Sequence, residues 1–269
     1  MRPARPSMNL KKTDTVTGVK DIMGKTTYDM GCRYSRDMII LPSMCGGDSR
    51  LSIPAAFDMF QDMATLHADH FDIGPEGMNR RNYFWIISKT AMHIYRMPVM
   101  MDHVEMRTWI QPADRAKCER DFALYSGDEC LLKLRSIWAV MSHDTGRIVP
   151  MAGLYPEIDF EEPSPEEIEF SKISKSFDGC EEIGRYLIRS VDIDLGGHMN
   201  NVNYIRAMLG CLSTEQVSSM SISDIEVQYI SQSYEGETLI FMKRDAADGS
   251  AEIGALKEDG KAAFLARLK

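Results

Sequence analysis

The chain has 269 residues, of which 44% are hydrophobic and 26% charged, which is the composition of a soluble globular protein with a sizeable core. Its formal net charge of -9 argues against a general nucleic-acid-binding protein and against broad attraction to anionic membranes. No apolar run approaches the roughly 20 residues of a membrane-spanning helix. The six cysteines are irregularly spaced and form no C-x-x-C pair, which favours free thiols, so we expect a cytoplasmic protein.

The first half of the chain predicts a disordered start, one long helix and then a run of strands. Residues 1–25 are polar and lack the apolar core of a signal peptide, so we expect a loosely ordered segment. Residues 54–70 carry apolar side chains at helical spacing, with Ser52 as a cap and Pro54 in the first turn. Turn signals then separate five expected strands, at 83–95, 103–111, 117–126, 130–142 and 147–151.

The second half of the chain repeats this order after a stretch rich in proline and glutamate at 156–170, which predicts an acidic linker. The elements expected after the linker are a strand at 185–192, a helix at 201–212, and strands at 222–232, 237–245, 250–257 and 261–268. We therefore predict an α+β fold in which one unit occurs twice, at 26–155 and at 171–269.

Faint internal similarity supports the duplication. The segment that starts at Gly46 before the first helix matches the one that starts at Gly196 before the second, an offset of 150 positions. Later strands match at an offset of 135. Three residues of the second unit then lie opposite other residue types in the first: Asp194 opposite Met44, His198 opposite Asp48, and Gln232 opposite Met97. The first unit has no acid and imidazole pair, so we expect the chemistry in the second.

The turn into the second helix carries the strongest candidate site. Asp194 and His198 lie where a strand gives way to a helix, so an acid and a base share one turn. Asn200 or Asn201 can cap the helix, whose free backbone N–H groups favour a developing negative charge. Two glycines permit positive backbone angles and close approach of a substrate, Gly196 and Gly197.

No metal or cofactor is expected from the sequence. His67 and His70 lie three residues apart on the first helix, but no third ligand follows at metal-site spacing, so packing or surface roles are favoured. The twenty methionines are assigned mostly to the core, because their side chains adapt to irregular apolar shapes.

The order of these motifs resembles the acyl-[acyl carrier protein] thioesterases of plants and bacteria, a family of hotdog-fold thioesterases. The resemblance runs from about Tyr28 to the C-terminus, and its main motif is Asp-x-x-x-His-x-Asn-Asn-x-x-Tyr from Asp194 to Tyr204. Supporting segments are Phe60 to His67, Trp85 to Ser88, Thr108-Trp109, Arg120 to Phe122 and Ser136 to Met141. The resemblance implies a tandem (double) hotdog, in which an antiparallel sheet wraps a central helix in each unit.

The chain departs from the family pattern at two places near this motif. The family sequence at the turn is Asp-x-Asn-x-His followed by Asn-Asn, and Gly196 stands where the family has its Asn. A further family carboxylate, usually Glu, falls at Gln232, and Ser233 replaces the Cys of the plant enzymes. The catalytic residues that the resemblance implies are therefore Asp194, His198 and Gln232.

The activity implied by the resemblance is hydrolysis of fatty acyl thioesters of acyl carrier protein to free fatty acid and holo-carrier. Asp194 is favoured as the general base, or less so as the nucleophile, while His198 and the helix N–H groups polarise the carbonyl. Alternatively, Asp194 holds the tautomer of His198, and His198 is the base. Gln232 cannot act as a base but can orient a water molecule.

The resemblance also implies an acyl pocket and a docking surface for a carrier protein bearing a fatty acyl-phosphopantetheine. Trp85 and Phe60 are candidates for the pocket. Because carrier protein is acidic, an acidic enzyme needs a local basic dock, for which the candidates are Arg80, Arg81, Arg115, Lys117 and Arg120. The expected state is a monomer whose units imitate a hotdog dimer, or a homodimer.

Three other functions remain open from the sequence. An acyl-CoA thioesterase of the same fold would use the same residues on another carrier. A hotdog hydratase or dehydratase resembles Asp-x4-His, whereas Asp194 and His198 are spaced as Asp-x3-His. A non-catalytic acyl-thioester-binding module would explain Gly196 and Gln232, but it would not explain why the acid and the imidazole are retained.

Overall fold

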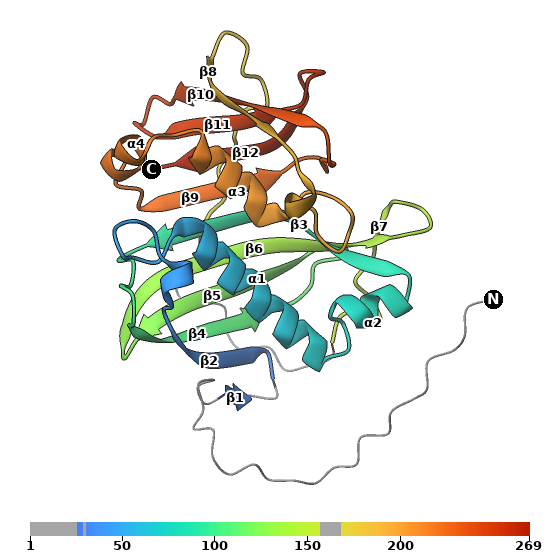
Figure 1. The fold of residues 1–269 in the computed structure, drawn as a ribbon. Helices are drawn as coiled ribbons and strands as arrows, with labels where there is room; N and C mark the ends of the chain where they lie inside the picture. The colour runs from blue at the N-terminus through green and yellow to red at the C-terminus, as the bar shows by residue number, and fades with distance from the viewer. Residues whose placement is uncertain (1–25, 29–30, 157–167) are drawn as a thin grey trace, which may run out of the picture.

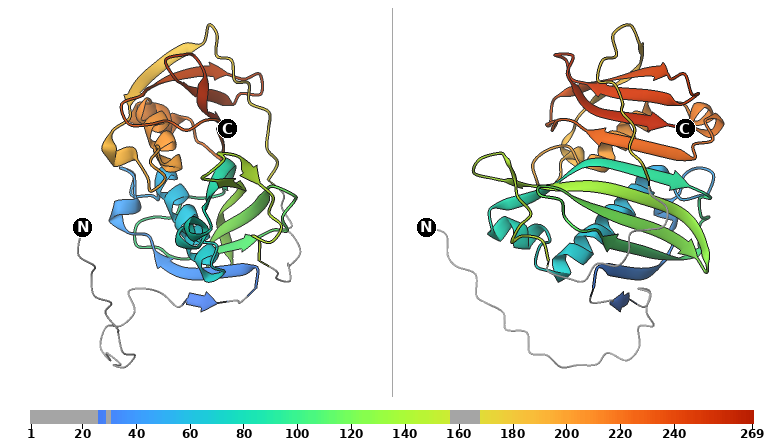
Figure 2. Two further views of the ribbon diagram at one scale, coloured as in Figure 1. Left: turned by 90° about the vertical axis from the view of Figure 1, so that its right-hand side faces the viewer. Right: turned by 180° about the vertical axis from the view of Figure 1, so that it is seen from behind.

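The structure is a computed structural model that describes residues 26–28, 31–156 and 168–269. One antiparallel sheet of twelve strands has the order β1-β2-β4-β5-β6-β3-β9-β12-β11-β10-β8, with β7 paired to β6. Helices α1 (Ile53–His70) and α3 (Asn201–Gly210) lie side by side on one face of this sheet (Figure 1). The view from behind in Figure 2 has the strands in front of both helices.

The N-terminal unit is formed by α1 and by the part of the sheet from β1 to β3, which curves behind the helix (Figure 1). Its strands are β1 (Thr26–Tyr28), β2 (Arg33–Ile39), β3 (Tyr83–Ile94), β4 (His103–Ile110), β5 (Cys118–Ser126), β6 (Glu129–Ser142) and β7 (Ile148–Val149). Its short helices are the 3₁₀ helix η1 (Pro42–Met44) and α2 (Pro75–Arg80).

The helix α1 forms where local signals and burial agree. The Ser52 hydroxyl accepts a hydrogen bond from the Ala55 N–H at 3.3 Å, and a proline stands in the first turn. The buried residues recur at helical spacing: Ala56, Phe57, Met59, Phe60, Met63, Ala64, His67 and Ala68. Each large apolar side chain buried here stabilises the fold by roughly 1.5–3 kcal/mol, so the core rather than intrinsic propensity holds the helix.

The C-terminal unit repeats this plan around the shorter helix α3. Its strands are β8 (Glu181–Leu187), β9 (Asp224–Tyr229), β10 (Thr238–Asp245), β11 (Ala251–Leu256) and β12 (Ala262–Leu268). A 3₁₀ helix, η2 (Ser190–Asp192), precedes α3, and α4 (Thr214–Ser219) follows it. The structure therefore has the predicted α+β architecture, with a helix against an antiparallel sheet in each unit.

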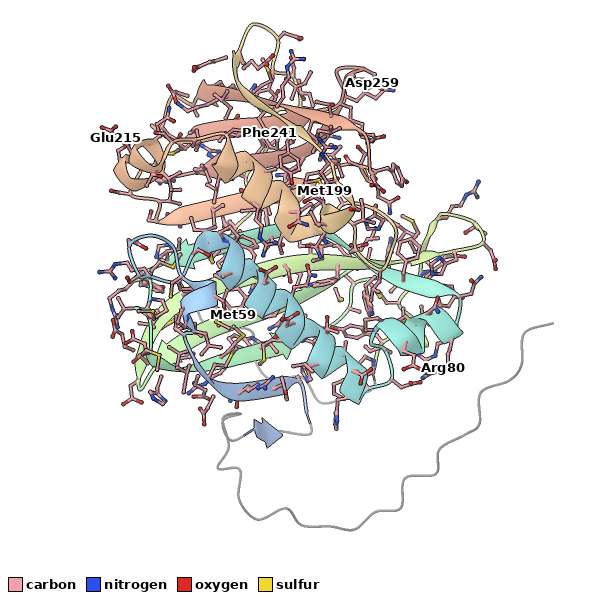
Figure 3. All side chains as sticks on the ribbon, in the orientation of Figure 1. Met59, Arg80, Met199, Glu215, Phe241 and Asp259 are labelled. Carbon is pink, nitrogen blue, oxygen red and sulfur yellow. The ribbon has the colours of Figure 1, made fainter. Side chains whose placement is uncertain are left out.

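The two units are joined by strand pairing, by a shared hydrophobic core and by an ion pair at the surface. Strands β3 and β9 pair from Lys89 with Gln228 to His93 with Asp224. One hydrophobic cluster includes buried side chains of both units. On the helices, Arg206 of α3 forms an ion pair with Asp58 of α1. Figure 3 shows the interior and the periphery of this arrangement, with Met59, Met199 and Phe241 in the former and Arg80, Glu215 and Asp259 in the latter.

Several predicted boundaries need correction. The strand expected at 185–192 is β8, which ends at Leu187, because the Asp192 carboxylate accepts hydrogen bonds from the Arg189 N–H at 2.8 Å and the Tyr186 hydroxyl at 2.9 Å and closes η2. The helix expected at 201–212 ends at Gly210. The strands β1 and β2 and the six-residue helices α2 and α4 were not predicted. The expected disordered segment at 1–25 and most of the expected linker lie outside the described residues.

Within the described ranges, no helix is both long and apolar enough to cross a membrane.

The buried imidazole of His67 makes stability depend on pH. Burial first, and then the nearby Arg120, lower the pKa of His67 to about 3. Between that value and about pH 6.5 the unfolded chain binds a proton that the folded chain does not, so acidification lowers the free energy of unfolding. The slope contributed by this group is at most about 1.4 kcal/mol per pH unit. We expect His67→Gln to flatten the pH dependence measured by urea denaturation, while the exposed His103→Gln follows the wild type. Equal slopes in all three proteins would contradict this account.

Candidate active site

The turn from η2 into α3 is a closed loop held by backbone hydrogen bonds. Ile193 and Met199 form an isolated β-bridge, and inside it the Asp194 N–H donates to the His198 carbonyl at 3.0 Å. The Gly197 N–H donates to the Asp194 carbonyl at 3.0 Å, and Gly197 has a positive φ of 77°. This φ favours glycine. Positive angles were predicted at both Gly196 and Gly197, and Gly196 does not have one.

The loop brings the acid and the imidazole together. His198 Nδ1 lies 3.7 Å from Asp194 Oδ2, which is ion-pair distance but longer than a hydrogen bond. The other carboxylate oxygen, Oδ1, accepts from the Gly196 N–H at 2.8 Å. Both side chains are partly open to solvent, 27% for Asp194 and 19% for His198, so a substrate and a water molecule can reach them.

Gly196 has a different task from its neighbour Gly197. Its φ is not positive, but a Cβ built on it would lie 2.7 Å from His198 Nε2 and 3.1 Å from Asp194 Oδ1. The imidazole therefore uses the room that a side chain at position 196 would need. The departure from the family's Asn thus sets where His198 can lie.

Most backbone N–H groups at the start of α3 already have hydrogen-bond acceptors within the protein. Asn200 is the N-cap, and its Oδ1 accepts from the Val202 N–H at 2.8 Å. The Asn203 N–H donates to the Asn200 carbonyl at 3.0 Å, while the Asn200 N–H donates to Asp192 O at 2.8 Å. Among described residues no acceptor is found for the Asn201 N–H. Of the backbone N–H groups expected to be free at the start of α3, only that of Asn201 remains so among the described residues. The side-chain amides of Asn200 and Asn201 are further donors.

Gln232 lies in the loop that follows β9, which reaches the turn through the backbone. The Met199 N–H donates to the Ser233 carbonyl at 2.8 Å. The Gln232 side chain itself is exposed, and its Oε1 accepts from the Tyr234 hydroxyl at 3.0 Å. The structure therefore brings the Gln232 segment to the site but directs its side chain to Tyr234. The Ser233 side chain is completely buried.

The N-terminal unit contains a matching turn with other side chains. The Gly46 N–H donates to the Arg50 carbonyl at 2.8 Å, as Asp194 does to His198, and Ser52 caps α1 as Asn200 caps α3. The true offset is 148 positions, the difference between the two caps, so the predicted offset of 150 is wrong. Gly46 and Arg50 are the counterparts of Asp194 and His198, so the two positions carry neither an acid nor an imidazole, although Asp48 lies between them in the turn.

The later offset of 135 is confirmed by a second pair of matching hydrogen bonds. The Leu51 N–H donates to the Pro98 carbonyl at 2.9 Å, just as the Met199 N–H donates to Ser233 at 2.8 Å. Gln232 therefore does lie opposite Met97, as the sequence predicted. Aligning the two loops on their glycines shifted the predicted correspondence by two positions, because the glycines occur at different points of the two loops.

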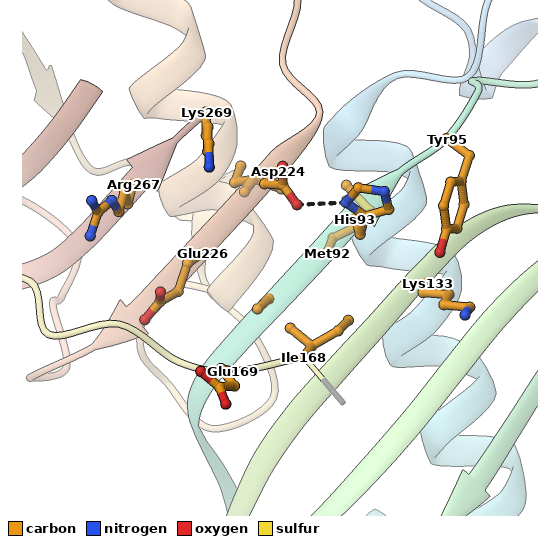
Figure 4. Close-up of a pocket in the computed structure, with 12 residues that line it drawn as sticks. Met92, His93, Tyr95, Lys133, Ile168, Glu169, Asp224, Glu226, Arg267 and Lys269 are labelled. Atoms are coloured by element: carbon orange, nitrogen blue, oxygen red, sulfur yellow. Dashed lines mark hydrogen bonds and ion pairs between the residues drawn. The ribbon is translucent and has the colours of Figure 1, made fainter. Parts of the chain in front are cut away.

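The two candidates for the acyl pocket lie in different parts of the N-terminal unit. Phe60 is 2% exposed and packs on Phe122 with ring centroids 5.3 Å apart. Trp85 is partly buried, donates its Nε1–H to the Ile73 carbonyl at 2.7 Å, and meets Trp138 edge to face. Neither residue lines the groove of about 470 Å³ in Figure 4, which lies over β3 and β9 and is lined by His93, Lys133, Asp224, Glu226, Arg267 and Lys269 among others.

Four of the five expected docking residues are exposed. Arg80 and Arg81, at the end of α2, both form ion pairs with Asp72, while Arg115 and Lys117 lie in the β4–β5 turn. Arg120 is a correction, because its side chain is 6% exposed and points from β5 toward α1, where Nη1 meets His67. A guanidinium in the interior cannot serve as a surface dock.

Within the described chain, no group of three or more His, Cys, Asp or Glu residues could hold a metal ion. His67 is buried and His70 exposed, so the pair predicted on one helix does not face a common site.

Sequence reasoning missed Asp192, which anchors the whole turn. Its carboxylate closes η2, and its carbonyl accepts from the Asn200 N–H at 2.8 Å and the Asn203 Nδ2 at 3.2 Å. The signal for this role was present, because an aspartate three residues after Arg189 can accept that residue's backbone N–H.

Two family profiles match most of this chain. The acyl-ACP thioesterase N-terminal domain matches residues 31–157, and the acyl-ACP thioesterase C-terminal domain matches residues 177–259. The chain belongs to the acyl-ACP thioesterase family. The resemblance inferred from the turn and its flanking motifs is thereby confirmed.

Curated relatives in the family are distant and longer. An oleoyl-acyl carrier protein thioesterase of Coriandrum sativum is 25% identical over 227 residues, covering 77% of this chain and 61% of the relative. A palmitoyl-acyl carrier protein thioesterase of Cuphea hookeriana is 24% identical over 243 residues, covering 85% of this chain and 56% of the relative. The chain thus spans somewhat more than half the length of these proteins. Both are named as chloroplastic, which overturns the expectation of a cytoplasmic protein.

Solved structures of the acyl-ACP thioesterase family share the fold over nearly their whole length. An acyl-ACP thioesterase from Bacteroides thetaiotaomicron has a TM-score of 0.80 at 22% identity, covering 88% of this chain and 96% of that one. A 12:0-ACP thioesterase from Umbellularia californica has a TM-score of 0.77 at 21% identity, covering 89% and 97%. The tandem hotdog fold is therefore confirmed.

The position of the imidazole gives a prediction at Gly196. Gly196→Ala should displace the His198 ring, because the new methyl group would fall 2.7 Å from Nε2. Gly47→Ala is the matched control in the N-terminal turn, since a Cβ there meets nothing within 4 Å. Two-dimensional NMR of the imidazole resonances should show a shift for His198 in the first variant only. An unmoved His198 resonance in Gly196→Ala would refute the steric account.

Proposed function

We propose that this chain hydrolyses fatty acyl thioesters of acyl carrier protein to the free fatty acid and the holo-carrier. The observation that carries the proposal is the Asp194 and His198 pair at the entrance of α3, with 3.7 Å between Oδ2 and Nδ1, in a chain of the acyl-ACP thioesterase family. The C-terminal unit carries the chemistry in this proposal, and the N-terminal unit holds the acyl chain.

In the proposed reaction, water adds to the thioester carbonyl carbon, and the carbon–sulfur bond then breaks. Asp194 accepts the proton of the water, for which its Oδ2 is available because Oδ1 is held by Gly196. His198 and the Asn201 N–H polarise the carbonyl oxygen and stabilise its negative charge. The proton finally passes to the leaving thiolate of phosphopantetheine.

The reversed assignment, with His198 as the base and Asp194 as the group that orients it, requires a closer contact than 3.7 Å. Gln232 completes the proposed site as a group that orients water. For that role its amide has to leave the Tyr234 hydroxyl, which is an exposed partner and costs little to give up.

Pairing of β3 with β9 supports a monomer as the working form, because the two hotdog units already complete one continuous sheet within one chain.

Turnover of purified acyl-ACP tests the proposed roles. Asp194→Asn and His198→Ala should each lower kcat by about 100-fold or more, since each removes a group that acts on the proton or the carbonyl. Arg50→Ala changes the counterpart of His198 in the N-terminal turn and should retain near wild-type turnover. Circular dichroism and the melting temperature check that each variant folds. If Asp194→Asn or His198→Ala kept full activity, the role given to that residue would be lost.

Comparison of carriers tests the partner. The same acyl group on acyl carrier protein and on CoA should give a higher kcat/KM with the protein carrier. Arg115→Glu combined with Lys117→Glu should raise KM for acyl-ACP several-fold and leave acyl-CoA unchanged, because these exposed cations attract an acidic carrier. Lys172→Glu combined with Lys175→Glu, at two exposed lysines in the segment before β8, is the charge-matched control. A preference for CoA would favour the acyl-CoA thioesterase instead, and turnover of neither would favour a binding module.

A further inference from the structure

Arg206 of α3 binds one residue of each unit at the same time. Its Nη2 forms the ion pair with Asp58 of α1, and its Nη1 donates to Asn203 Oδ1 at 2.7 Å. Asn203 in turn donates from Nδ2 to the Asp192 carbonyl at 3.2 Å. A continuous set of contacts, from Asp58 through Arg206 to Asn203, therefore connects the helix of the N-terminal unit with the backbone of the turn before α3.

The Asp192 carbonyl is placed to control the geometry of this turn. It also accepts the Asn200 N–H at 2.8 Å, so it joins the residue before the loop to the helix cap after it. Asp194 and His198 project from the loop between these two residues, with 3.7 Å between Oδ2 and Nδ1. A shift of this carbonyl would move both ends of the loop, and misplaced functional groups slow a reaction even when all of them are present.

Asp58 and Arg206 occupy equivalent positions in the two helices. They are separated by 148 positions, the same offset as the two helix caps, Ser52 and Asn200. The helices lie side by side where the two residues meet (Figure 1). An ion pair between equivalent positions has no preferred direction of its own, so either unit could continue it through the residue one helical turn earlier.

Only the C-terminal unit has a side chain that continues the contact. The counterpart of Asn203 is Ala55, whose methyl group cannot form a hydrogen bond. The Met44 carbonyl, the counterpart of that of Asp192, accepts the Ser52 N–H at 3.0 Å. Among the residues that the structure describes, no side-chain donor reaches the Met44 carbonyl. The ion pair is therefore linked to the turn that has the acid and the imidazole and not to the matching turn before α1.

Exposure of the ion pair limits what it contributes to stability. The side chains of Asp58 and Arg206 are 39% and 47% exposed. Water screens such surface pairs, and most of them contribute little to the free energy of folding. An effect on turnover that is large beside the effect on stability would therefore have to come from the position of the turn.

We infer that Asp58, Arg206 and Asn203 are positioning residues, which hold the turn before α3 in the geometry that thioester hydrolysis requires. None of the three acts on the substrate. The helix α1 of the N-terminal unit thereby takes part in the reaction through its hold on Asp194 and His198. This inference rests on the proposed thioesterase function and adds the residues that fix its geometry.

Two single variants, assayed with acyl-ACP, each break one link of the connection. Asp58→Asn removes the charge that holds Arg206. Asn203→Asp can still accept from Arg206, but it has no N–H to donate to the Asp192 carbonyl. Each variant should lower kcat about 5-fold and leave KM within about 2-fold of the wild type, because the chemical step and not binding is affected. Wild-type kcat in either variant would overturn the inference and leave thioester hydrolysis established.

Glu129→Gln is the matched control for Asp58→Asn. Glu129 forms an ion pair with Arg96 at 2.7 Å, and these side chains are 56% and 41% exposed. Both variants replace a half-exposed acid by its amide, but only Asp58 is connected to the turn before α3. Glu129→Gln should keep wild-type kcat, and a loss equal to that of Asp58→Asn would overturn the inference.

Combined variants separate a connection from independent effects. Asp58→Asn with Asn203→Asp should have the kcat of the slower single variant, because both changes break the same connection. Multiplied losses would show two independent effects and overturn the inference.

Reversal of the charges separates positioning from simple stabilisation. Asp58→Arg with Arg206→Asp can re-form an ion pair, but a carboxylate at position 206 cannot donate to Asn203 Oδ1. The melting temperature should recover relative to Arg206→Asp alone, while kcat stays low. Recovery of kcat together with the melting temperature would show that the pair only stabilises the fold.

The imidazole resonance of His198 gives a test that needs no turnover. Two-dimensional NMR should show this resonance shifted in Asp58→Asn and unchanged in Glu129→Gln. An unmoved resonance in Asp58→Asn would overturn the inference. If the wild type failed to hydrolyse acyl-ACP although the resonance moved, the proposed function would be lost and the hold of α1 on the turn would remain.

Discussion

The backbone pairing of β3 with β9 is the constraint on which the rest of the structure depends. It joins two half-sheets into one and covers one open edge of each hotdog unit, that of β3 and that of β9. It also fixes α1 beside α3, where Asp58 and Arg206 meet. Since β9 leads into the loop whose Ser233 carbonyl accepts the Met199 N–H, the same pairing sets the position of the turn that carries Asp194 and His198.

At the candidate site, the groups that hold the turn in place differ from the side chains proposed to act on the substrate. Backbone hydrogen bonds and the Asp192 carboxylate hold the turn, whereas Asp194 and His198 project from it and remain partly accessible. The loss of the family's Asn is not a simple deletion, because the imidazole fills the room next to Gly196. Asp194 and His198 therefore occupy an arrangement that a bulkier residue 196 would disturb.

The sequence predicted those parts of the fold that depend on residues close together in the chain. The helix at 54–70 was found because its cap, its proline and its apolar spacing agree, and the acid and imidazole were found because they share one turn. Features set by distant contacts were missed. The end of β8 depends on Asp192 meeting Tyr186, and the burial of Arg120 depends on which face of β5 meets α1. The direction of the Gln232 side chain likewise depends on Tyr234, an exposed neighbour that no periodicity reveals.

The matching turn before α1 has a consequence for how such a protein can change. Its loop is closed by the same main-chain hydrogen bonds as the loop before α3, although Gly46 and Arg50 stand at the positions of Asp194 and His198. Main-chain bonds do not depend on side-chain identity, so this loop keeps its shape while its residues vary. Side chains at positions 46 and 50 can therefore be exchanged without loss of the hydrogen bonds that close this loop, and without any change at Asp194 and His198.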